Sequence, residues 1–322
     1  MVKMRTKKTG SKKLVFVLLK ALGIIVCILV TVILIAESAL LYCENHDFSD
    51  QNGLDKKEFS CHRGDLKIRG TVFMPSGQTD VPIAIICHEF MTNRLFSYPY
   101  AMALARSGYA AFCFDFCGGG IVCGSDGDSR DMSVLTEVED LKSVIAFAKE
   151  QRYTSDELLL LMGCSQGGLV AALTAAEMPE GVSGLILQYP ALCIPDAARK
   201  GEMLWLKFDP AHIPEKMHAG PMRLGRRYAA DVMDMDAFQN ITGYTGKVLL
   251  LHGDRDTIVD MEYSKRAFAV YQAAGADARF VTIPGGKHIF RRSAHIRQAQ
   301  KTIAGFAENI KEDNYEIDNS LV

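Results

Sequence analysis

The sequence predicts an α/β fold, with a mostly parallel, twisted sheet that carries helices on both faces. Short apolar runs recur along the chain and alternate with segments of ten or more residues whose apolar positions repeat at helical spacing. The 322 residues are 48% hydrophobic and 23% charged, which suits one globular domain plus an appendage. The formal net charge of -2 argues against a nucleic-acid-binding protein.

The first predicted element is a hairpin at residues 57–75, where polar and apolar residues alternate on both sides of a turn at Arg63-Gly64-Asp65. The later strands are short apolar runs, and we place them at 81–88, 109–116, 157–163, 182–190, 247–253 and 278–285. The helical spacing predicts helices at 96–108, 133–151, 169–177, 263–275 and 292–312. Gly108 is typical of a residue that ends a helix.

Residues 191–246 interrupt this alternation. They contain no apolar run of strand length, and they include Trp205, several methionines and four prolines, at positions 195, 210, 214 and 221. Since a compact α/β core does not need so long a connection, we expect an inserted cap.

The N-terminal end predicts a membrane anchor. Lysine and arginine residues are frequent in the basic tail 1–13, and the apolar stretch 14–36 that follows has 23 residues. A helix of that length can cross a hydrocarbon core of about 30 Å. A cleaved signal peptide is the alternative, because Ala36-Glu37-Ser38 resembles a cleavage site, but the core of a signal peptide is usually shorter.

These features predict the organisation of the whole chain. We expect a single-pass protein of the cell membrane, held in the lipid bilayer by residues 14–36, with a cytoplasmic N-terminus and an extracytoplasmic folded domain, or a secreted protein if the segment is cleaved. The nine cysteines match no disulfide framework or zinc site, and Cys87 and Cys113 lie in apolar runs and are expected to be buried. The predicted segments are the tail 1–13, the anchor 14–36, a linker 37–54, a core formed by 55–190 and 247–312, the cap 191–246 and a polar tail 313–322.

The stretch Gly163-Cys164-Ser165-Gln166-Gly167 fits the pattern G-x-S-x-G. It lies between a predicted strand and a small-residue helix, where this pattern forms a sharp turn that exposes the serine hydroxyl at the C-terminal edge of the sheet. A side chain at either flanking glycine would clash with the neighbouring strand or helix. A serine that only caps a helix in a glycine-rich turn is the alternative.

A reactive serine needs a base and an acid to orient it. Asp254 and Asp256 follow the predicted strand 247–253, and His288 follows the strand 278–285, so all three lie past C-terminal strand ends, where open α/β sheets carry their sites. We assign His288 as the base and Asp256 as the acid, with Asp254 as the rival acid or a turn carboxylate. The expected oxyanion donors are the backbone N–H groups of Phe90 and Gln166.

Together, these motifs resemble the α/β-hydrolase superfamily, and more narrowly the bacterial feruloyl and cinnamoyl esterases and the serine aminopeptidase-like hydrolases. The resemblance covers residues 55–310 and rests on HEFMTNR (88–94), CFDFCGGG (113–120), MSVLTEVEDL (132–141), GCSQGG (163–168) and HGDRDTIV (252–259). It implies an α/β-hydrolase fold and a serine esterase that acts on small-molecule esters of the feruloyl, cinnamoyl or short-chain acyl type without a metal or cofactor. DPAHIP (209–214) extends the resemblance into the cap, where it implies that Asp196 and Tyr228 contact a substrate phenol.

Three departures from the family pattern leave the substrate open. Glu89 replaces a glycine beside the oxyanion hole, Cys164 replaces a histidine, and the loop 118–125 is longer than usual. The alternatives are a peptidase with Glu89, Glu202 or Glu215 as partners for a substrate amine, a lysophospholipase or acyl lipase, an acyltransferase, and a non-catalytic surface binding protein.

Overall fold

The structure, a computed structural model, describes residues 53–320. The predicted anchor at 14–36 and all but the last two residues of the predicted linker lie outside the described residues. Within 53–320, no helix combines the length and the apolar character needed to cross a membrane. The seven cysteines in this part of the chain have free thiols, and Cys87 and Cys113 are fully buried, as predicted.

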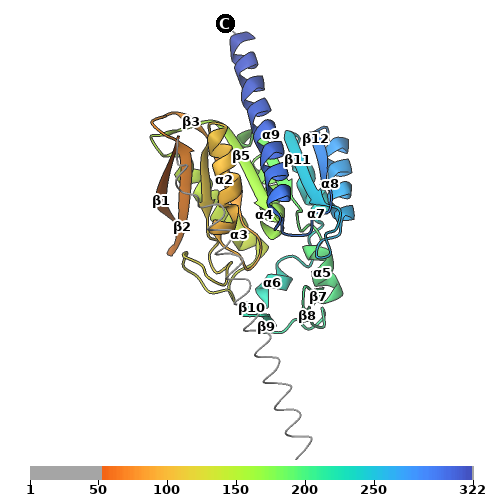
Figure 1. Ribbon diagram of the computed structural model, residues 1–322. Helices are drawn as coiled ribbons and strands as arrows, with labels where there is room; N and C mark the ends of the chain where they lie inside the picture. Colours follow the sequence, from red (N-terminus) through yellow and green to blue (C-terminus); the bar gives the residue numbers. More distant parts are fainter. Residues whose placement is uncertain (1–52, 321–322) are drawn as a thin grey trace, which may run out of the picture. The chain divides into compact units, whose positions relative to one another are not determined.

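An eight-stranded sheet forms the centre of the described domain (Figure 1). Its order is β1-β2-β4-β3-β5-β6-β11-β12. The antiparallel pair β1–β2 is the predicted hairpin, β2 also pairs antiparallel with β4, and the strands from β4 to β12 run parallel. This confirms the predicted α/β-hydrolase fold with a mostly parallel sheet. The strands are β1 (Leu54–Arg63), β2 (Leu66–Pro75), β3 (Val81–Cys87), β4 (Ala110–Phe114), β5 (Thr154–Cys164), β6 (Gly184–Gln188), β11 (Lys247–Gly253) and β12 (Asp277–Ile283).

Helices pack on this sheet in two groups, α2 with α9 and α3 with α4 (Figure 1). Ser133 begins α3 because its hydroxyl accepts the N–H of Thr136, whose side chain accepts the Ser133 N–H in return. The helices are η2 (Arg94–Ser97), α2 (Tyr98–Arg106), α3 (Val134–Lys149), α4 (Gln166–Glu177), η3 (Pro179–Gly181), α8 (Met261–Ala273) and α9 (Ser293–Ser320).

The last helix is longer than predicted. We expected a helix to residue 312 and then a polar tail, but α9 continues to Ser320. We placed the end of the helix where the helical spacing of apolar residues ends. Once a helix has formed, however, each further residue adds one backbone hydrogen bond, so the helix can continue without burying a face. Asp313, in the extension, forms an ion pair with Lys247 at the start of β11.

Residues 191–246 contribute no strand to the central sheet, as predicted. Their short strands form two separate two-stranded sheets, drawn together at one end of the domain in Figure 1. The C-terminal part of this insertion, α7 and η4, returns to pack against α4. Its elements are α5 (Ile194–Lys200), β7 (Glu202–Met203), β8 (Leu206–Lys207), β9 (Lys216–Ala219), β10 (Met222–Gly225), α6 (Arg227–Ala230), α7 (Ala237–Asn240) and η4 (Ile241–Gly243).

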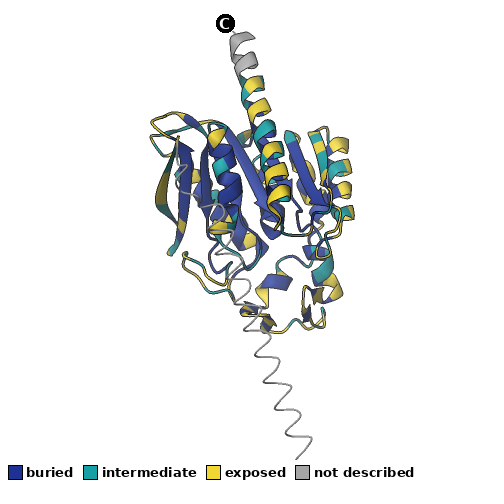
Figure 2. Ribbon diagram, viewed as in Figure 1, coloured by how far each residue is buried: buried dark blue, intermediate teal, exposed yellow. Residues whose placement is uncertain are grey.

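The core lies on both faces of the inner strands. Every residue of β4 and β6 is buried, and so is all of β3 except Pro82, whereas the edge strand β12 buries only Ile283 (Figure 2). Buried inner strands are the expected outcome for a parallel sheet covered by helices. The rigid carboxyl ends of these strands carry the loops described next.

Candidate active site

Ser165 occupies the turn between β5 and α4 in a strained conformation, with φ 51° and ψ -117°. The turn requires the flanking glycines that the sequence suggested. A Cβ atom on Gly163 would lie 2.1 Å from the carbonyl oxygen of Gly167, and one on Gly167 would lie 2.5 Å from that of His88. Both obstacles are backbone atoms that cannot move aside, so the close approach of strand, turn and helix excludes side chains there.

The structure brings the three predicted residues together. Ser165 Oγ lies 2.9 Å from His288 Nε2, and His288 Nδ1 lies 2.8 Å from Asp256 Oδ2. Asp256 follows β11 and His288 follows β12, so neighbouring parallel strands deliver the acid and the base to the same edge of the sheet. The spacing of this hydrogen-bonded line is that of an activated nucleophile, its base and the group that orients the base.

Asp256 is ionised in this arrangement. Burial of the carboxyl would raise the pKa of Asp256, but hydrogen bonds from His252 and His288 outweigh that effect and hold the pKa well below its usual range. The rival carboxylate, Asp254, accepts the backbone N–H of Gly285 at 2.6 Å and therefore has the turn role that the sequence offered as its alternative.

The two predicted oxyanion donors are available. In the described residues, neither the Phe90 nor the Gln166 backbone N–H has a hydrogen-bond partner. The loop that carries Phe90 is fixed by His88, whose Nε2 accepts the N–H of Phe116 at 3.1 Å while its Nδ1 donates to the Glu89 carbonyl at 2.7 Å. Burial lowers the pKa of His88, which keeps the ring neutral, as one donating and one accepting nitrogen require.

The side chain of Gln166 links the core to the cap. Its Nε2 donates to Glu137 Oε2 at 2.8 Å, and its Oε1 accepts the hydroxyl of Tyr228 at 2.8 Å. The Tyr228 ring stacks on Phe90, with centroids 5.3 Å apart. Burial raises the pKa of Glu137 well above its usual range, which favours the protonated carboxyl. Tyr228 therefore connects the two residues whose amides are the candidate oxyanion donors.

The two predicted substrate contacts lie in different surroundings. Tyr228 is only 2% exposed, and its hydroxyl is occupied by Gln166. Asp196, on α5, accepts the hydroxyl of Tyr263 at 2.8 Å and pairs with Arg199 at 2.5 Å. No hydrogen bond in the described residues joins Asp196 to Ser165, His288 or Asp256. Contact of Asp196 or Tyr228 with a substrate stays a prediction.

Glu89 does not point a free carboxylate at the oxyanion loop. Its Oε1 accepts the hydroxyl of Tyr189 at 2.9 Å, its Oε2 accepts that of Thr92 at 3.1 Å, and the residue is 6% exposed. The Tyr189 ring packs against His288 with centroids 4.9 Å apart. Glu89 therefore forms part of the wall that supports the imidazole.

Sequence reasoning missed the supporting residues Glu137, Tyr189 and His252. Glu137 is a carboxylate in a predicted helix, and its burial and its contact with Gln166 distinguish it from surface acids. Tyr189 lies inside the predicted strand 182–190 but directly follows the observed β6, and its φ of 39° is a conformational feature that the sequence does not encode recognisably. His252 is buried near the end of its strand, and its contact with Asp256 was not foreseen.

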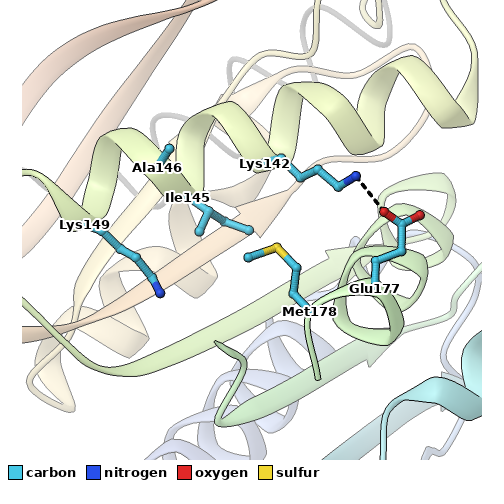
Figure 3. Close-up of a pocket in the computed structure, with 6 residues that line it drawn as sticks. All are labelled: Lys142, Ile145, Ala146, Lys149, Glu177 and Met178. Carbon is cyan, nitrogen blue, oxygen red and sulfur yellow. Dashed lines mark ion pairs between the residues drawn. The ribbon is translucent and has the colours of Figure 1, made fainter. Parts of the chain in front are cut away.

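A surface pocket lies away from these residues, between α3 and the C-terminal end of α4 (Figure 3). Lys142 Nζ pairs with Glu177 across it at 2.6 Å. Glu177 ends the helix that Gln166 begins, which separates the two by roughly 17 Å along the axis. The pocket is therefore not part of the site around Ser165. It is lined by Lys142, Ile145, Ala146, Lys149, Glu177 and Met178.

The fold and the hydrogen-bonded serine, histidine and aspartate define a serine hydrolase of the α/β-hydrolase class. The chain belongs to the prolyl oligopeptidase family, whose family model matches residues 100–313. That range contains Ser165, Asp256 and His288.

Individual proteins resemble the chain over different lengths. Est1E from Butyrivibrio proteoclasticus with bound ferulic acid superimposes with a TM-score of 0.71 at 28% identity, covering 77% of this chain and 97% of Est1E. The esterase Pf2001 from Pyrococcus furiosus superimposes with a TM-score of 0.60 at 16% identity. The superposition covers 80% of this chain and 93% of the Pf2001 chain and shows a shared fold. An uncharacterized 31.7 kDa protein from the traX-finO intergenic region of Escherichia coli is 31% identical over 134 residues, which is 41% of this chain and 45% of that relative.

Proposed function

We propose that this protein hydrolyses carboxylic esters through an acyl-enzyme formed on Ser165. The observation that carries the proposal is the continuous hydrogen-bonded line from Ser165 through His288 to the ionised Asp256. The similarity to Est1E, which binds ferulic acid, supports an ester as the substrate.

In the proposed reaction, Ser165 Oγ attacks the ester carbonyl while His288 Nε2 takes the hydroxyl proton. Asp256 accepts the His288 Nδ1–H, which fixes the tautomer and stabilises the imidazolium. The imidazolium then protonates the leaving alcohol. Water enters, His288 removes its proton, and hydrolysis of the acyl-enzyme returns the free serine.

The negative charge of the tetrahedral intermediate needs donors that are already in place. The unpartnered N–H groups of Phe90 and Gln166 are suited to this role. Gln166 is the first residue of α4, so the helix dipole adds favourable potential at the same point. The proposed chemistry uses these donors and the three side chains, without a metal or an organic cofactor.

For the substrate, we propose an aryl ester of the feruloyl or cinnamoyl type, or a short-chain acyl ester, with residues 191–246 forming one wall of its pocket. In this proposal Asp196 reaches the substrate phenol when Tyr263 releases it. The similarity to Est1E over 77% of this chain, in a structure with bound ferulic acid, supports a related pocket.

A peptidase is the second candidate, and the family name favours it. An aminopeptidase needs a free carboxylate for the substrate amine. The three candidates from the sequence are engaged: Glu89 binds two hydroxyls, Glu202 pairs with Lys207 at 2.9 Å and Glu215 pairs with Arg226 at 3.4 Å. This pairing favours the esterase.

The experiment is a substrate panel on the full chain in detergent, with Ser165→Ala as control. The panel contains p-nitrophenyl acetate, longer acyl esters, methyl ferulate, a lysophospholipid and aminoacyl anilides. We expect ester turnover that falls by about 10⁴-fold or more in Ser165→Ala, with an unchanged circular dichroism spectrum. Turnover retained by this variant would refute the proposal, and faster cleavage of anilides than of esters would favour the peptidase.

We also propose that residues 14–36 anchor the protein in the cell membrane, with the hydrolase domain on the extracytoplasmic side. The support is the sequence of a basic tail followed by 23 apolar residues. In membrane fractions washed with alkaline carbonate, the full-length chain should stay in the pellet. A shortened chain in the soluble fraction would indicate cleavage instead.

A further inference from the structure

His252, the second-last residue of β11, lies directly behind Asp256. The residue is fully buried. Its Nε2 lies 3.1 Å from Asp256 Oδ2 and 3.1 Å from the carbonyl oxygen of Val259, and its Nδ1 lies 2.7 Å from the hydroxyl of Ser264 on α8. Every polar atom of this ring therefore has a protein partner.

These partners determine where the imidazole carries its proton. The two groups that face Nε2 are a carboxylate and a carbonyl, which only accept hydrogen bonds, so Nε2 must be protonated. The partner of Nδ1 is the Ser264 hydroxyl, whose hydrogen bond in the described residues goes to this ring. Ser264 donates to Nδ1, and the Nε2–H tautomer of His252 results.

The consequence appears at Asp256. Oδ2 accepts from His288 and lies 3.1 Å from Nε2 of His252, whose N–H also bonds the Val259 carbonyl, while Oδ1 accepts the backbone N–H groups of Ile258 at 2.8 Å and Val259 at 3.0 Å. The side chain is fully buried, so water does not replace a lost donor. Three hydrogen bonds and the adjacent Nε2–H of His252 hold the carboxylate in one orientation.

We propose that His252 is a positioning residue of the hydrolase, because its Nε2–H fixes the carboxylate that orients His288. This inference rests on the proposed function. His252 touches neither the serine hydroxyl nor the oxyanion donors, and it acts only through Asp256. Without this adjacent N–H, Oδ2 can turn away from His288 Nδ1, and the imidazole loses its alignment with Ser165.

The test compares His252→Gln with His252→Met in the full chain. The two side chains are unbranched and similar in length, but only glutamine has an N–H donor. We expect His252→Met to lower kcat for p-nitrophenyl acetate by about 10- to 100-fold with little change in KM, since loss of a hydrogen bond to a charged group has this size. His252→Gln should retain kcat within about threefold of wild type.

Two results would overturn the inference. One is a folded His252→Met variant with wild-type kcat. The other is an equal loss of kcat in both variants, because volume rather than the donor would then matter. The Ser165→Ala variant distinguishes failure of this inference from failure of the proposed function. If Ser165→Ala keeps ester turnover, the proposed hydrolase function is wrong. If turnover depends on Ser165 but not on His252, only the inference about His252 is wrong.

A second measurement needs no variant and covers the case in which His252→Met does not fold. Nitrogen-15 NMR of the histidine rings in the wild-type chain reports which ring nitrogen bears hydrogen. We expect the His252 signal, assigned through its absence in His252→Gln, to show a protonated Nε2. A ring protonated only at Nδ1 cannot donate to Asp256 and would overturn the inference.

Discussion

Replacement of Tyr228 by phenylalanine removes one hydrogen bond and leaves the aromatic ring in place. The Tyr228 hydroxyl donates to Gln166 Oε1 at 2.8 Å, and both residues are almost fully buried. Without this donor, the amide oxygen of Gln166 is left without a partner in the described chain. An unsatisfied buried acceptor costs about 1–3 kcal/mol. We therefore expect Tyr228→Phe to lower the free energy of unfolding by that amount, measured by urea denaturation.

The same substitution distinguishes two roles for this tyrosine. The phenylalanine ring can still stack on Phe90, and Gln166 is still held by Glu137, so the oxyanion donors shift only slightly. We expect kcat/KM to fall by less than about tenfold, and by the same factor for methyl ferulate and methyl cinnamate, which differ in the phenol hydroxyl and the methoxy group of the ring. The assay is a comparison of the two esters on wild type and variant.

A contrary result is easy to recognise. If Tyr228→Phe leaves the unfolding free energy unchanged and slows methyl ferulate alone, the hydroxyl binds the substrate phenol and the contact with Gln166 has no structural importance. Tyr263→Phe is the matched control, because it removes a tyrosine hydroxyl bound to the partly exposed Asp196. It should destabilise the domain less than Tyr228→Phe.

Three further predictions concern the same site. Asp256→Asn should lower kcat for p-nitrophenyl acetate by about 10⁴-fold with the fold intact, and a loss below tenfold would exclude Asp256 as the acid. Burial raises the pKa of Glu137 in the folded chain, so wild-type stability should fall relative to Glu137→Gln as pH rises above about 4.5, the ordinary glutamate pKa. Urea titrations of both proteins at pH 4.5 and 8 check this sign. Gly167→Ala should abolish the folded protein, because the new Cβ would meet two backbone carbonyls. Gly305→Ala has open space around its Cβ and should raise the melting temperature. Equal melting behaviour of the two variants would contradict the packing argument.

The parallel sheet could be predicted because strands that are buried on both faces consist of continuous apolar residues. Strands such as β3 and β11 are continuous apolar runs, and a strand buried on both faces has no other pattern. The strained turn at Ser165 was also predictable, because glycines on both sides of the serine indicate backbone contacts too close for a side chain. Asp256 and His288 each follow one of two successive strands, and this order predicted that they lie near each other at the carboxyl edge of the sheet.

The supporting contacts could not be predicted because they join distant segments through particular side-chain orientations. Glu137, Gln166 and Tyr228 come from three separate elements, and no pattern in the sequence indicates that their side chains hydrogen-bond to one another. Glu89 replaces a glycine beside the oxyanion hole, but its carboxylate accepts the hydroxyl of Tyr189, which lies 100 positions later in the sequence. The end of α9 was missed because the helix continues to Ser320, beyond the last apolar residues at helical spacing.

The most direct measurement of the proposed reaction is labelling of the full chain with a fluorophosphonate, followed by peptide mass spectrometry. A serine made nucleophilic by an adjacent imidazole should take up one phosphonyl group per chain, at residue 165, and His288→Ala should slow that uptake by at least about a hundredfold. Undiminished modification of Ser165→Ala, or a wild-type chain that stays unmodified, would contradict the account.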